Sequence, residues 1–303
     1  MEQGTLDAVI RRQFEKCRRT GKGMAKNFGV EDIHQFRVAT KRLRALLRLA
    51  AASGHSHISP KLPRNLKVYY RMAGVLRMLQ LQKMALEEAA VRMHQGFPAK
   101  CIALLDDRIG VVENMIRLYL GSSRPFGGER AEWHDPLTSR TSKAAKEAFI
   151  AVNVKACSPP DPAVLPDDEG LHTIRKAMKD LLYGWPFFSK EEIENAIPEG
   201  LPARTHLETC ERLLGNFHDI VVVLSLFRDK SFLLCTCPHS ARFLEGVEQL
   251  WLSDKRSLLE KIKDQFLTKG GTSIAGGEGE DRNNGNPMGA PNLNMESYEL
   301  HVE

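Results

Sequence analysis

A helical protein with an internally duplicated unit is the fold that the sequence predicts. Between Leu6 and Leu267, apolar residues recur at steps of three and four in each segment that shows a regular period, which is the spacing of one helix face. A helix with a continuous basic stripe occurs twice, in residues 33–50 and in residues 171–187. The 303-residue chain is 42% hydrophobic and 27% charged, which is typical of a folded, soluble protein with one large domain or two bundles.

Helices account for each periodic segment in turn. They are expected, in chain order, over residues 6–26, 33–50, 62–95, 98–120, 139–156, 171–188, 203–228 and 239–267. The third could break near Gly74, and the sixth should end at Pro186, because proline cannot donate the helical hydrogen bond.

The first basic helix, residues 33–50, carries cations on one face and apolar side chains on the other. The basic face consists of His34, Arg37, Lys41, Arg44 and Arg48. Phe36, Leu43 and Leu47 step along the opposite face, and their burial would point the basic groups together in the other direction. A solvated outer face would be the ordinary explanation, but such a face normally interleaves Glu with Lys or Arg. This helix contains no acid, so the counter-charge must come from a polyanionic ligand or from acids on a neighbouring helix.

The second basic helix repeats this pattern. Its basic side is formed by His172, Arg175, Lys176, Lys179 and Tyr183. At a constant offset, His34 aligns with His172, Arg37 with Arg175 and Lys41 with Lys179. Such repetition indicates a duplicated structural unit.

These two motifs resemble the signatures of the CHAD domain (conserved histidine α-helical domain), a family whose members bind inorganic polyphosphate. Residues 33–44, IHQFRVATKRLR, are similar to V-H-x-x-R-V-x-x-R-R-L-R, and residues 171–181 are similar to L-H-x-x-R-K-x-x-K-x-L. The resemblance extends over roughly residues 6–267. It implies an all-α fold of two repeated helical bundles, with the basic helices lining a shared surface or pore.

The division of the chain follows from composition. Residues 121–136 mix Gly, Ser and Pro with charges and are the expected boundary between the halves. The first bundle repeat is therefore assigned to residues 1–125 and the second to residues 137–269. Residues 270–303 are rich in Gly and Asn without apolar periodicity, and we expect a disordered tail.

A Gly-containing segment follows each basic helix and resembles the family pattern L-G-x-x-R-D-x-D. The first copy keeps Gly74 and Arg77, but Met78 and Gln80 replace the acids. The second copy keeps Asp219, which either orders His172 or Arg175 or lies on a helix surface paired with a nearby Lys or Arg.

The composition and motifs exclude several other classes of protein. No apolar run approaches the length of a membrane span, and residues 1–20 lack a signal-peptide core, so we expect a cytoplasmic protein without a membrane partner. No catalytic constellation, cofactor motif or metal site is expected. Residues 235–239, CTCPH, could form a metal loop, but no second ligand pair accompanies them, which favours free thiols.

Polyphosphate binding without catalysis is the function that the resemblance implies, with association with polyphosphate granules. A net charge of +5 is only mildly basic, so the inference depends on local charge. The candidate binding residues are His34, Arg37, Lys41, Arg42, Arg44, Arg48, Arg64, Lys67, Arg71, Arg77, His172, Arg175, Lys176, Lys179 and Tyr183. The alternatives are a nucleic-acid-binding helical protein, although few aromatics accompany the cations, and an accessory of phosphate metabolism that acts beside an enzyme on another chain.

Overall fold

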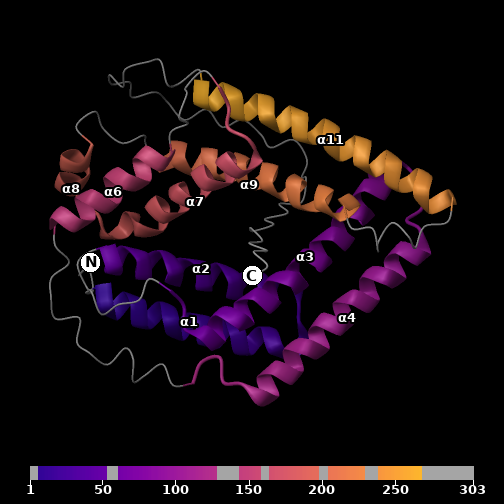
Figure 1. Cartoon of the computed structure of the whole chain (residues 1–303), viewed down its shortest axis with the longest axis horizontal. Coiled ribbons are helices and arrows are strands. Elements are labelled where there is room, and N and C mark those ends of the chain that lie inside the picture. Colours follow the sequence, from indigo (N-terminus) through magenta and orange to yellow (C-terminus); the bar gives the residue numbers. More distant parts are fainter. Residues whose placement is uncertain are drawn as a thin grey trace, which may run out of the picture.

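The structure, a computed structural model, describes residues 6–52, 61–127, 143–157, 164–197, 204–228 and 238–267. Within these ranges every regular element is a helix, which confirms the all-α prediction (Figure 1). The expected tail and most of the expected boundary between the halves lie outside the described residues.

The helices follow the order expected from the sequence. They are α1 (Leu6–Asn27), α2 (Val30–Ala52), α3 (Arg64–Arg92), α4 (Ala99–Ser122), α6 (Lys143–Cys157), α7 (Asp168–Gly184), α8 (Lys190–Ala196), α9 (Arg204–Leu224) and α11 (Pro238–Leu267). Two points differ from expectation. The helix α3 runs through the buried Gly74 without a break, and the short helix α8 was not predicted.

Local chemistry explains where the two basic helices begin and end. Acidic residues occupy the first turn of both α2 and α7, where they favour the positive end of the helix dipole. The Asp167 side chain caps α7 by accepting a hydrogen bond from the Gly170 backbone N–H at 2.8 Å. The α-helix α7 ends at Gly184 and continues as a short 3-10 helix, Trp185–Phe187, as Pro186 requires.

The apolar face of α2 is buried as predicted. Phe36, Leu43 and Leu47 are each at most 1% exposed, in a core formed with α1, α3 and α4. The Phe36 and Tyr69 rings lie 5.0 Å apart, and the Tyr69 hydroxyl donates to the Gly21 carbonyl oxygen at 2.7 Å. Burial of these three side chains stabilises the position of α2 by several kcal/mol, since each contributes about 1.5–3 kcal/mol.

Two hydrophobic cores join the two halves of the chain. The C-terminal part of α3 and the start of α4 share one core with α9 and α11, so α3 links the first helices to the last ones (Figure 1). A second core places Leu49 of α2 against Phe149 and Ile150 of α6 and Leu181 of α7. The halves therefore pack as one body, and the assignment of two repeats to residues 1–125 and 137–269 stays a prediction.

In the ranges described above, no helix combines the length and the apolar character needed to cross a membrane.

Candidate functional site

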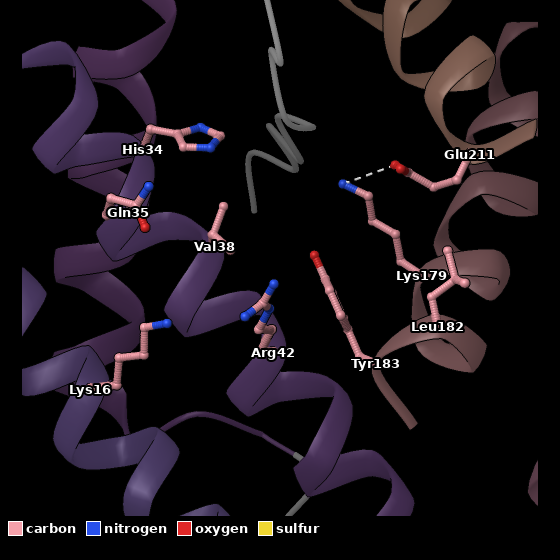
Figure 2. Close-up of a pocket in the computed structure, with 9 residues that line it drawn as sticks. All are labelled: Lys16, His34, Gln35, Val38, Arg42, Lys179, Leu182, Tyr183 and Glu211. Carbon is pink, nitrogen blue, oxygen red and sulfur yellow. Dashed lines mark ion pairs between the residues drawn. The ribbon is translucent and has the colours of Figure 1, made fainter. Parts of the chain in front are cut away.

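A pocket of about 320 Å³ lies where the two basic helices approach each other (Figure 2). Its lining residues come from α1, α2, α7 and α9, and they are Lys16, His34, Gln35, Val38, Arg42, Lys179, Leu182, Tyr183 and Glu211. Four of the nine are basic and one is acidic. The pocket is therefore suited to an anion.

Helix geometry decides which side chains reach this pocket. On α2, His34, Val38 and Arg42 recur at steps of four, on a different side from the buried Phe36. On α7, Lys179 and Tyr183 show the same step. The Arg42 guanidinium lies 5.7 Å from the centre of the Tyr183 ring, so the two helices also interact across the pocket.

Two charged lining residues were missed in the sequence, as were the uncharged Gln35, Val38 and Leu182. Lys16 belongs to the lead helix and Glu211 to α9, and both lie outside the repeated motifs. Lys16 stands one residue before the buried Cys17, so the helical pattern places it near the edge of the buried face of α1, but no signal in the sequence connects Glu211 to α7.

A buried basic cluster adjoins the pocket. The rings of His172 and His218 are stacked, with centroids 4.6 Å apart and planes 25° apart. Burial, followed by the charges of Arg175, His172, Lys41 and Lys179, lowers the pKa of His218 to about 2. Its Nε2 atom is buried and has no hydrogen-bond partner among the described residues. His218 is therefore a neutral ring among cations.

Arg175 is the largest fully buried side chain of the described residues, at 1% exposure. Its Nε lies 3.3 Å from Glu211 Oε1, and Lys179 Nζ lies 3.3 Å from the same oxygen. A Cβ added at Gly215 would lie 3.3 Å from Arg175 Nη2, which explains why the second Gly-containing segment keeps glycine there. This segment thus accommodates the guanidinium of the preceding basic helix.

Asp219 follows Gly215 by one turn of α9 and is 4% exposed. This burial excludes the alternative of a helix-surface position. A role in ordering His172 or Arg175 stays a prediction.

The first Gly-containing segment has a different role. Arg77 is 7% exposed, and its Nη1 donates to the Val30 carbonyl oxygen at 3.0 Å. Gln80 Nε2 donates to the Phe28 carbonyl oxygen at 2.9 Å, next to the left-handed backbone of Phe28, whose φ is 53°. Both side chains therefore hold the turn between α1 and α2, and a part of Arg77 in ligand binding stays a prediction.

The remaining cations of α2 point to other neighbours. Arg37 is 2% exposed, and its guanidinium lies 4.9 Å from the Tyr70 ring centre, with Arg44 at 6.0 Å from the same ring. Arg48 Nε donates to Asp180 Oδ2 at 2.8 Å, and its Nη2 contacts Oδ1. For Arg48, an acid of the neighbouring helix α7 supplies the counter-charge, so the stripe is not uncompensated along its whole length.

The other candidate residues lie apart from the pocket lining. Arg64, Lys67 and Arg71 are exposed on α3, and Lys176 is half-buried on α7. Their part in binding stays a prediction, as does that of Lys41, which is half-buried and acts on His218 through its charge.

Among the residues with described side chains, no group of three or more His, Cys, Asp or Glu is arranged to hold a metal ion. Residues 235–237 of the possible metal loop at residues 235–239 lie outside the described ranges.

Comparisons with known proteins agree with this architecture. The family model of the CHAD domain matches residues 8–228. The chain is also similar to the crystal structure of the CHAD domain from the plant Ricinus communis, with a TM-score of 0.60 and 18% sequence identity over 86% of this chain and 90% of that chain. At this identity the likeness shows the fold alone. A comparison with curated proteins found no match. Because the family model covers most of its length, the chain belongs to the CHAD domain family.

Proposed function

We propose that the pocket between α2 and α7 binds inorganic polyphosphate without chemical conversion of the ligand. The observation that carries this proposal is the convergence of four basic side chains from three helices on one pocket, namely Lys16, His34, Arg42 and Lys179. The family membership supports the same ligand.

The chemistry of the pocket suits a phosphate chain. Polyphosphate has closely spaced negative charges and no base edges, so its recognition needs cations at intervals. Arg42 can offer a planar fork to phosphate oxygens, Lys16 and Lys179 add point charges, and the Tyr183 hydroxyl can donate a hydrogen bond.

Nucleic acid is the alternative polyanion, and the pocket suits it less well. Single-stranded nucleic acid is usually held by several aromatic side chains on which successive bases stack. Apart from His34, Tyr183 is the only aromatic residue among those that line the pocket, and Arg42 already lies against its ring. Association with polyphosphate granules would follow from polyphosphate binding and is part of the same proposal. An accessory role beside an enzyme on another chain stays a separate alternative.

A titration of the purified protein with polyphosphate, single-stranded RNA and duplex DNA at matched salt tests the proposal. We expect polyphosphate to bind most tightly per phosphate and its affinity to fall steeply with salt, because binding releases condensed counterions. Equal affinity for RNA per phosphate would favour the nucleic-acid alternative, and a flat salt response would contradict charge-driven binding.

Paired variants locate the site. Arg42→Gln together with Lys179→Gln should weaken polyphosphate binding by at least about tenfold, since two phosphate contacts to cations are lost. Lys190→Gln together with Arg204→Gln is the control, because both side chains are exposed, on α8 and α9, and this variant also loses two positive charges. If the control variant weakens binding as much as the pocket variants, the binding depends on net charge and not on this pocket.

A further inference from the structure

Glu211 is the only acid among the residues that line the pocket. It lies on α9, and its carboxylate approaches Lys179 on the side of the pocket across from the α2 residues His34 and Arg42 (Figure 2). An acid in a pocket of cations lowers its attraction for an anion, so its presence there requires an explanation.

One oxygen of this carboxylate serves two cations. Glu211 Oε1 lies 3.3 Å from both Arg175 Nε and Lys179 Nζ, while charge-assisted hydrogen bonds are usually about 2.7–2.9 Å long. This oxygen is buried and makes no hydrogen bond of ordinary geometry to the described residues. The interaction is therefore mainly electrostatic, without the directional contacts that hold a structural ion pair in place.

The surroundings of Glu211 need negative charge. Arg175 and Lys179 are 2% and 14% exposed in their side chains, and the charge of Lys41 also acts within this cluster. His218, stacked on His172, lies among the same cations, and burial followed by these charges lowers its pKa. Without an anion, these close positive charges would repel one another in a poorly solvated place.

We propose that Glu211 is an internal counter-ion that holds an anion position in the free protein, and that a bound phosphate takes over Lys179, which lines the pocket, from it. This inference rests on the proposed binding of polyphosphate. Glu211 then limits the affinity of the pocket, because the ligand must compete with a carboxylate that is always present.

Comparison of Glu211→Gln with Glu208→Gln tests this inference. Both variants remove one negative charge from α9, but Glu208 is exposed and pairs with Arg204 at 2.8 Å, so it controls for the change in net charge. Relative to Glu208→Gln, Glu211→Gln should bind long-chain polyphosphate about tenfold more tightly, since a close like charge is removed from the ligand position. The free Glu211→Gln protein should also melt at a lower temperature, because Arg175 and Lys179 lose their anion.

Several outcomes overturn the inference. If both variants change the affinity equally, only net charge matters. If Glu211→Gln weakens binding, Glu211 positions the two cations and does not compete with the ligand. If the wild-type protein itself does not bind polyphosphate, the proposed function fails as well, and this result is distinct from the other two.

A second pair of variants keeps the test decisive if Glu211→Gln does not fold. Lys179→Gln should weaken polyphosphate binding, and the double variant Lys179→Gln/Glu211→Gln, which restores the net charge, should recover part of the lost affinity. Equal or weaker binding by the double variant would overturn the inference.

Discussion

Acidification should destabilise this protein through one buried histidine, His218. Its pKa in the folded protein is about 2, while its ordinary value is 6.5, so at mildly acidic pH the unfolded chain binds a proton that the folded protein excludes. The contribution to stability is present above pH about 6.5 and is lost as the pH falls below that value. At pH 5.5 the unfolded state gains about 1.4 kcal/mol from this proton, and at pH 7.5 less than about 0.1 kcal/mol.

Urea unfolding followed by far-UV circular dichroism at pH 5.5 and 7.5 measures this effect. Other groups also titrate in this range, so the variant His218→Gln, which keeps a neutral polar side chain, is measured in parallel. The wild-type protein should lose about 1.3 kcal/mol more free energy of unfolding than the variant between the two pH values. Equal losses would refute the reasoning, because they would mean that the ring is protonated in the folded protein as easily as in the unfolded chain.

Three further outcomes are expected. Gly215→Ala should lower the free energy of unfolding by roughly 1 kcal/mol, because the added Cβ would crowd the buried Arg175 guanidinium. Gly110→Ala should raise the free energy of unfolding by up to about 1 kcal/mol, because a Cβ at this helical position would meet no described atom within 4 Å. Urea unfolding measures both. Arg48→Gln should cost roughly 1 kcal/mol in the same assay, since the partly exposed pair with Asp180 joins α2 to α7, and Lys190→Gln on the surface should cost nothing measurable. Polyphosphate at a hundredfold excess over its Kd should stabilise the folded protein by about 2.7 kcal/mol, which a thermal melt would record as a rise of several degrees.

Much of the fold can be predicted from local sequence patterns. The three-four spacing of Phe36, Leu43 and Leu47 predicts both the helix and its buried face, and the structure buries all three residues. Pro186 ends α7 where its missing donor requires. The two His-containing motifs indicated the family that the comparison with family models confirms. These features depend on residues close in the chain, so a single sequence is enough to predict them.

Tertiary packing determines which side chains line the pocket. The sequence assigns Arg37, Arg42 and Arg48 to one basic helix, but only Arg42 lines the pocket, while Tyr70 and Asp180 engage the other two.

Likewise, Lys16 and Glu211 join the pocket from positions outside the recognised motifs. Helical periodicity determines which face a side chain occupies, and it contains no information about which helix packs against that face. The packing of α2, α7 and α9 against one another therefore determines the partner of each cation, because charge pairing depends on distances between residues far apart in the chain.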